Sequence, residues 1–195
     1  MIVYDSLPGR DELNERARPK APAMPEATDA HRAVGRQLRM IHDAHRRELA
    51  AIRAIVDRIE ADGLGRDGTG DDLAGAIDGM GMARDLRLFG ALCGRECQHL
   101  QFHHDIEEGH TFPIMEARGG EGLRAVIAKL REEHHVVHAL IGALAERGEA
   151  FLRGPDARRL AALREVLDRL DAVVASHFGY EEAELEEALG VHRAL

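Results

Sequence analysis

The chain has 195 residues, and its 26 lysines and arginines against 35 aspartates and glutamates give a net charge of −9. This length allows one domain with a proper hydrophobic core, and the acidic balance argues against a nucleic-acid or anionic-membrane surface, since both need a basic face. With no Trp, two Tyr and five Phe among many Ala, Leu, Arg and Glu residues, the composition favours helices over a sheet.

The compartment is predicted from signals that are missing. Residues 1–20 lack the charged start, apolar stretch and cleavage site of a secretory signal. No run approaches the roughly 20 apolar residues needed to cross a bilayer, and two cysteines are too few for a disulfide framework. We therefore expect a cytoplasmic protein with neither nucleic acid nor membrane as a partner.

The N-terminal residues 1–27 are predicted to form an extended or disordered arm, because four of the six prolines lie there among charged residues. Thr28 or Asp29 can then cap a helix. A helical bundle is expected over residues 28–190, followed by a short tail at 191–195.

The first long helix should run from about 29 to 62 and stop at Gly63. Its inward stripe steps by four and three residues and contains two histidines: Leu38, His42, His45, Leu49, Ile52, Val56 and Ile59. Residues 63–72 form a turn-rich loop, whose aspartates do not have the spacing of a calcium loop.

Three further long helices are predicted. A short extra helix near Asp72 should break at residues 79–81, and a long helix should then run from about 82 to 111 and end before Pro113. The next spans about 121 to 152, and Gly154-Pro155 separates it from the last. Four amphipathic helices with short connections indicate an all-α, up-down-up-down four-helix bundle.

Histidines and carboxylates recur at helical spacing on all four long helices. They are His42, then His104 with Glu108, then His134 with His138, then His177 with Glu182. Residues at i and i+4 share one helix face, so each pair can bind a metal ion from one rigid element. At ~1.5 Å per residue, their distances from the helix ends place all four sets within roughly 10 Å of one level in an antiparallel bundle.

In the motifs of the second and fourth long helices, identical residues stand next to each other, so the sequence alone leaves open which of two neighbours is the ligand. His103 and Glu107 fall on a more polar row than His104 and Glu108, which we therefore prefer; Glu181 completes the i+4 row after His177, whereas Glu182 lies one step off it.

Other patterns carry less weight. Two E-x-x-H motifs of the ferritin-like type, Glu96 with His99 and Glu132 with His135, have their histidines off the inward stripes, so we interpret both as coincidence. Cys93 and Cys97 are predicted to be packed, reduced thiols. Imidazole with carboxylate suits iron, zinc or manganese, so the ligand types alone do not choose the metal.

In these motifs the chain resembles the hemerythrin family, including its bacterial HHE cation-binding domains. That family's pattern is a lone His, then H-x-x-x-E, then H-x-x-x-H, then H-x-x-x-x-D or E. Here it is met by His42, His104, Glu108, His134, His138, His177 and Glu182, over roughly residues 30–188. The resemblance implies two irons bound by the five histidines, with Glu108 and Glu182 bridging them beside an oxo or hydroxo group.

The resemblance also implies an open position on one iron for dioxygen, peroxide or nitric oxide. Our leading hypothesis is a non-haem di-iron protein that binds or senses dioxygen or a related small reactive molecule. Two alternatives stay open: a di-iron enzyme that consumes peroxide or nitric oxide, and a metal-dependent regulatory module that meets a protein partner through the arm. For an enzyme, His45 and Tyr180 are the obvious acid or base candidates.

Overall fold

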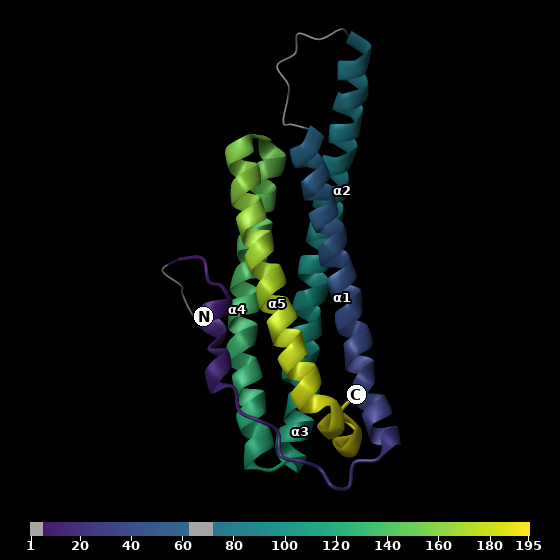
Figure 1. Ribbon diagram of the computed structural model, residues 1–195, viewed down its shortest axis with the longest axis vertical. Helices are drawn as coiled ribbons and strands as arrows, with labels where there is room; N and C mark the ends of the chain where they lie inside the picture. The colour runs from purple at the N-terminus through teal and green to yellow at the C-terminus, as the bar shows by residue number, and fades with distance from the viewer. Residues whose placement is uncertain (1–5, 63–71) are drawn as a thin grey trace.

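The computed structural model describes residues 6–62 and 72–195, with the backbone alone for residues 62 and 72–80. Its helices are η1 (Arg10–Leu13), η2 (Glu15–Ala17), α1 (Asp29–Asp62), α2 (Asp72–Ile106), the π-helical η3 (Glu107–Thr111), α3 (Phe112–Arg118), α4 (Glu121–Arg153) and α5 (Ala157–His192) (Figure 1). No strand occurs among the described residues. The predicted all-α bundle is confirmed. The predicted loop at 63–72 lies outside the described residues except for Asp72, which begins α2.

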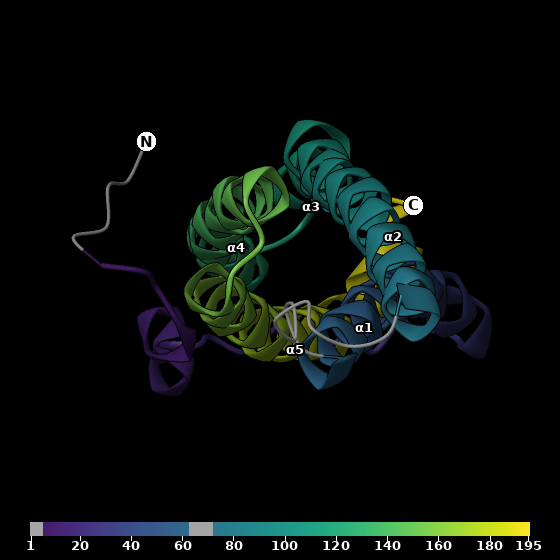
Figure 2. The ribbon, with the colours of Figure 1, turned by 90° about the horizontal axis from the view of Figure 1, so that it is seen from above.

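Four long helices form a ring. Each packs against two others, so that α1 contacts α2 and α5, while α4 contacts the same two helices on the opposite side. Figure 2 shows this ring from above. In Figure 1 the chain runs upward in α1 and α4 and downward in α2 and α5. Side chains from all four helices can therefore meet on the axis of the ring.

The buried apolar side chains form two clusters. The larger lies in the upper part of the bundle and includes Ile52, Phe89 and Leu144, and the smaller lies near the lower end and includes Phe112 and Ile127. Burying each such side chain stabilises the fold by about 1.5–3 kcal/mol. Between the clusters lies a band of buried histidines and glutamates. The apolar clusters thus position a polar layer inside the bundle.

Helix α2 departs from the prediction at both ends. The predicted break at residues 79–81 and the separate short helix before it are wrong, because α2 is continuous from Asp72. A glycine inside a helix costs only about 1 kcal/mol, which the rest of a long helix can offset.

The predicted end before Pro113 is also wrong, because the helix continues through η3 into α3. The N–H of Phe112 donates to the carbonyl of Glu107, five residues back, which makes a wider π turn. Pro113 has no N–H to donate and its ring would clash with the preceding turn of an ordinary α-helix, so a wider turn accommodates it. This π turn begins at Glu107, inside the polar layer.

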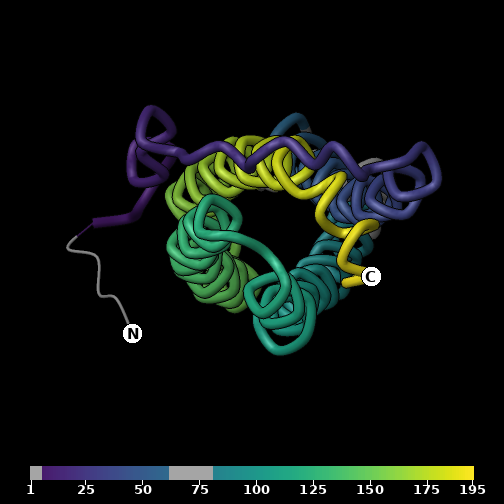
Figure 3. Tube along the Cα trace, turned by 90° about the horizontal axis from the view of Figure 1, so that it is seen from below, coloured from purple at the N-terminus to yellow at the C-terminus, as the bar shows by residue number. Residues whose placement is uncertain are grey.

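The N-terminal segment packs against the bundle. Leu13 is fully buried in the upper apolar cluster, and the Tyr180 hydroxyl donates to the carbonyl of Pro19 over 2.8 Å. Glu184 accepts hydrogen bonds from Lys20 Nζ at 2.8 Å and from the Ala21 N–H at 2.7 Å. Figure 3 shows the segment crossing below α5 to reach the start of α1. Residues 6–28 are therefore anchored by contacts along their length.

None of the described helices combines the length and the apolar character needed to cross a membrane.

Helices α1 and α5 approach closely at two glycines. A β-carbon on Gly35 would overlap the carbonyl of Glu186, and one on Gly190 would overlap the carbonyl of His31. Both obstacles are backbone atoms, which cannot move without shifting a helix. The close approach of these two helices therefore requires residues without a β-carbon at both positions.

We expect Gly35→Ala to lower the free energy of unfolding by about 1–3 kcal/mol, because α1 and α5 must move apart. Urea denaturation of the purified protein measures this. Gly142→Ala is the matched control: Gly142 is an exposed helix residue with open space around it, and alanine there should stabilise by up to about 1 kcal/mol. Equal effects of the two substitutions would contradict the close contact.

Candidate metal centre

Six histidines from the four long helices lie in the polar layer between the apolar clusters. They are His42 of α1, His103 and His104 of α2, His134 and His138 of α4, and His177 of α5. All are buried except His138, which is half-buried. The expected convergence of histidines from four separate segments at one level of the bundle is therefore observed.

The first group of possible ligands consists of three histidines. One nitrogen from each of His104, His134 and His177 lies within 4.8 Å of the others. The Nε2 atom of each is buried without a hydrogen-bond partner. The rings of His104 and His134 stack with centroids 4.0 Å apart. Unpartnered buried polar atoms are costly, so three that converge indicate a cation between them.

The second group joins two histidines to two carboxylates. Ligand atoms of His42, His103, Glu107 and Glu181 also lie within 4.8 Å of one another. The two Nε2 atoms of His42 and His103 face each other at 3.0 Å. Both oxygens of Glu107 and the Oε2 of Glu181 are buried without a hydrogen-bond partner. This group has the mixed imidazole and carboxylate donors that suit iron, zinc or manganese.

Each of these carboxylates reaches from one group to the other. Glu107 places Oε1 3.3 Å from His103 Nε2 and Oε2 3.5 Å from His134 Nε2. Glu181 places Oε2 3.5 Å from His42 Nε2 and 3.7 Å from His177 Nε2. Two carboxylates that each contact both groups are suitably placed to bridge two cations.

The electrostatics of the layer also favour a cation. Burial, together with the charge of nearby Glu181, raises the pKa of Glu107 well above its ordinary value. Burial lowers the pKa of His103 to about 2 and those of His104 and His134 well below their ordinary value. These histidines are therefore neutral at pH 7, which is the form that binds a metal.

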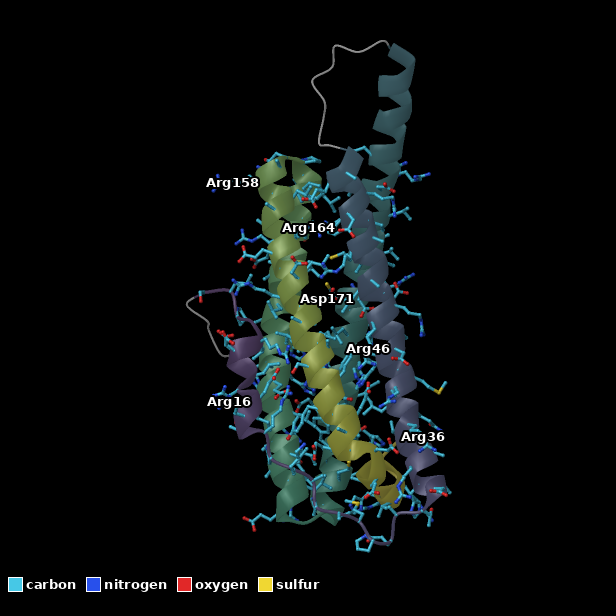
Figure 4. The ribbon with its side chains drawn as sticks, viewed as in Figure 1. Arg16, Arg36, Arg46, Arg158, Arg164 and Asp171 are labelled. Carbon is cyan, nitrogen blue, oxygen red and sulfur yellow. The ribbon has the colours of Figure 1, made fainter. Side chains whose placement is uncertain are left out.

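Glu108 and Glu182, which we predicted as bridging ligands, lie outside both groups. Glu108 Oε1 is 2.8 Å from His134 Nδ1, and its other oxygen pairs with Arg131. Glu182 Oε1 is 3.0 Å from His42 Nδ1 and 2.7 Å from Arg46, which Figure 4 places where α1 faces α5.

Helix register explains this on α5 only. Glu181 follows His177 by four residues and shares its inward face, whereas Glu182 lies one step further round the helix. Glu107 and Glu108 each follow a histidine of a ligand group by four residues, and the contacts separate them: Glu107 lies between His103 Nε2 and His134 Nε2, while Glu108 meets the outer nitrogen of His134. Burial disfavours the charge of Glu182, but hydrogen bonds from His42 and Arg46 outweigh it and lower its pKa to about 2.

A third carboxylate with the same role was missed. Glu133 Oε2 is 3.1 Å from His177 Nδ1, and Arg18 of the N-terminal segment donates to both Glu133 oxygens at 2.8 and 2.9 Å. His42, His134 and His177 thus each have a carboxylate on Nδ1, which leaves Nε2 directed inward. The doubled glutamate before His134 was the sequence signal for Glu133, although sequence alone did not reveal its partner on α5.

His138 and His103 are placed differently from the prediction, whereas His104 belongs to the first ligand group as a possible ligand. His104 Nδ1 lies 3.0 Å from His138 Nε2, so His138 contacts the outer side of the His104 ring. Gln101 Nε2 donates to the other nitrogen of His138 over 3.4 Å. His138 belongs to neither ligand group, whereas His103, which we had assigned to a polar row, belongs to the second.

The remaining sequence patterns fall outside both groups. Glu96 pairs with His45 at 2.7 Å, both buried, rather than with His99, which is exposed. His135 is exposed and contacts the carbonyl of Arg131. Neither E-x-x-H motif therefore forms a ligand group. Cys93 and Cys97 are free thiols, and Cys93 is buried.

Comparison with known families agrees with this arrangement. A family model described as Hemerythrin HHE cation binding domain matches residues 33–189. The matched region includes both ligand groups and all four long helices. No curated protein and no solved structure gives a significant match.

The neutral buried histidines predict acid sensitivity in the metal-free protein. Because the pKa of His103 falls from 6.5 in the unfolded chain to about 2 in the folded protein, its contribution to stability is lost as the pH falls below 6.5. We expect the His103→Gln free energy of unfolding to fall less steeply below pH 6.5 than that of the wild type, by up to about 1.4 kcal/mol per pH unit.

Urea denaturation of both proteins after chelation, at several pH values between about 5 and 7.5, measures this difference. Glu107 changes the free energy of unfolding with pH in the opposite sense, since its pKa is raised. Because Glu107 is present in both proteins, its contribution largely cancels when the two pH profiles are compared. Parallel pH profiles would contradict the neutral state of His103.

The N-terminal segment should influence the centre through Arg18. Removing this arginine leaves the buried Glu133 carboxylate without its counter-charge and with only the contact to His177 Nδ1, so Arg18→Gln should destabilise the protein by about 3 kcal/mol. Metal affinity should fall about 10-fold or more, because Arg18 no longer holds in place the carboxylate that contacts His177. Competition with a chelator measures the affinity. Arg16→Gln is the matched control, since Arg16 is an exposed residue of the same segment (Figure 4); equal effects would contradict the link.

Proposed function

We propose that this chain, which belongs to the hemerythrin HHE cation-binding family, holds two iron ions in the polar layer and there binds or senses dioxygen or a related small reactive molecule. One observation carries the proposal: buried nitrogen and oxygen atoms without hydrogen-bond partners converge from α2, η3, α4 and α5 on the centre of the bundle. A folded protein leaves such atoms unpartnered at high cost, and a bound cation removes that cost.

The ligand set that the contacts support differs from the one expected from sequence. In our proposal the first ion is bound by Nε2 of His104, His134 and His177. The second is bound by Nε2 of His42 and His103, the two histidines of the second group. Glu107 and Glu181, rather than Glu108 and Glu182, would hold both ions, since each contacts histidines of both groups. The total is still five histidines and two carboxylates, with His103 in place of His138.

The two proposed ions are not equivalent. The first would have three histidine donors and the second two, while Glu107 and Glu181, which contact histidines of both groups, would serve both ions. The second ion therefore has one protein ligand fewer, and we assign the open position to it. Iron at this position supplies redox chemistry toward a small molecule such as dioxygen. The protein's part is to hold the ligands and to limit access to the position.

The surroundings limit that access. Phe178 stacks on the His42 ring with centroids 3.7 Å apart, and its side chain is fully buried. The apolar clusters lie above and below the layer. An apolar surrounding keeps water away from a redox metal and affects its potential.

The test compares two adjacent glutamates. Wild-type protein reconstituted anaerobically with ferrous iron should retain about two irons per chain, and exposure to air should produce the charge-transfer absorption of a bridged ferric pair. Glu107→Gln should abolish the absorption and the paired stoichiometry. Glu108→Gln is the matched control and should keep both at saturating iron, with affinity about 10–100-fold weaker.

If Glu108→Gln abolished the absorption and the paired stoichiometry while Glu107→Gln kept both, Glu108 rather than Glu107 would be the bridging ligand. A reconstituted wild-type chain that retains no metal would contradict the function itself. An anaerobic-to-aerobic absorption titration then tests the response to dioxygen, and oxygen release from added hydrogen peroxide would instead indicate the enzymatic alternative.

A further inference from the structure

A pocket of about 290 Å³ leads from the surface to the second ligand group. Its inner end is lined by His103, Glu107 and Glu181. Its walls come from α1, α2 and the C-terminal end of the chain, including Leu38, Ile41, Phe102, Ile106, Leu189 and Leu195. The pocket therefore reaches the group to which we assign the open position, and it does so on one side of the bundle.

The mouth of this pocket is unusually apolar for a protein surface. Phe102 is 63% exposed, Leu195 47%, Ile106 45% and Ile41 40%, and all four line the same opening. Single exposed apolar residues need no explanation, but a group of them at one opening indicates a binding site.

The volume is larger than a diatomic molecule requires. An engineered cavity of about 150 Å³ lined by aliphatic and aromatic side chains binds benzene, and one water occupies about 30 Å³ of the liquid. A pocket of about 290 Å³ can therefore hold an organic molecule somewhat larger than benzene.

The lining also restricts the charge of the occupant. The polar side chains are His45, His99 and Thr111, besides those at the inner end. No lysine or arginine is among the described residues that line it, so the walls offer neither of these cations to an anionic head group. Apolar walls with a few polar groups match a neutral molecule with one polar end.

We propose that this pocket binds a neutral, mainly apolar organic molecule carrying one small oxygen-bearing head group, a hydroxyl or hydroperoxyl, with the head directed toward Glu107 and Glu181. The placement of the head next to a metal ion rests on the proposed function. Occupation of the pocket by the apolar part depends only on the described side chains.

The experiment uses the absence of tryptophan from the chain. Phe102→Trp places a single fluorescent reporter at the mouth, where high exposure should allow the larger side chain. The full-length variant is titrated with 1-octanol, both metal-free and loaded with zinc, which is not redox-active. We expect a saturable shift in emission, with 1-butanol binding at least about tenfold more weakly because its shorter chain buries less apolar surface.

Two further variants supply the controls. Leu88→Trp reports from an exposed apolar position on α2 that does not line the pocket, and it should show no saturable response. Ile106→Arg in the Phe102→Trp background should weaken octanol binding about tenfold or more. Thermal unfolding confirms that each variant is folded.

Three results would overturn the proposal: no saturable response from the Phe102→Trp protein, an equal response from Leu88→Trp, or tighter binding of octanoate than of octanol by the metal-free protein. Iron content is measured separately on the wild type. Octanol binding without iron retention would contradict the proposed function but support the proposal for the pocket. Iron retention without octanol binding would support the proposed function but contradict the proposal for the pocket.

Discussion

The structure depends on two buried carboxylates that face buried histidines. Glu107 and Glu181 lie in the centre of the bundle and contact rings from all four long helices. Burying carboxylate charge without a counter-charge is costly, and burial accordingly raises the pKa of Glu107. A cation shared between the carboxylates, as we propose, would offset this cost. For the histidines to meet these carboxylates, the four helices must place them at one level. The apolar clusters above and below fix the helices in that alignment.

Around this centre, arginines connect the ligand histidines to the protein surface. In three cases a carboxylate contacts Nδ1 of the histidine and an arginine pairs with that carboxylate; the arginines are Arg46 for His42, Arg131 for His134 and Arg18 for His177. Such contacts orient the imidazole rings and increase their basicity as metal ligands. Because Arg18 comes from the N-terminal segment, that segment is physically linked to the centre through two side chains. A partner that displaced the segment would alter the orientation of His177.

The two sides of the centre have different surroundings. The first histidine group is enclosed by α2, α4 and α5, and His138 covers the outer side of His104. The second group has fewer histidines and borders the apolar pocket. An open coordination position, if placed at the second ion, would therefore lie where the bundle admits a molecule from outside. The distribution of donors and the position of the pocket point to the same side.

Residue types and spacing alone predicted the helical bundle, the four helices that carry ligands and the common level of His42, His134 and His177, because helical periodicity defines which face is buried. They could not choose between neighbours in the doubled motifs. Successive residues on a helix differ by about 100° in direction, and in a ring of four helices both can point inward or toward an adjacent helix. Tertiary contacts decided that Glu107 and Glu181 face the centre while Glu108 and Glu182 pair with arginines. The link from Arg18 to Glu133 joins residues 115 positions apart, so only the folded chain could reveal it.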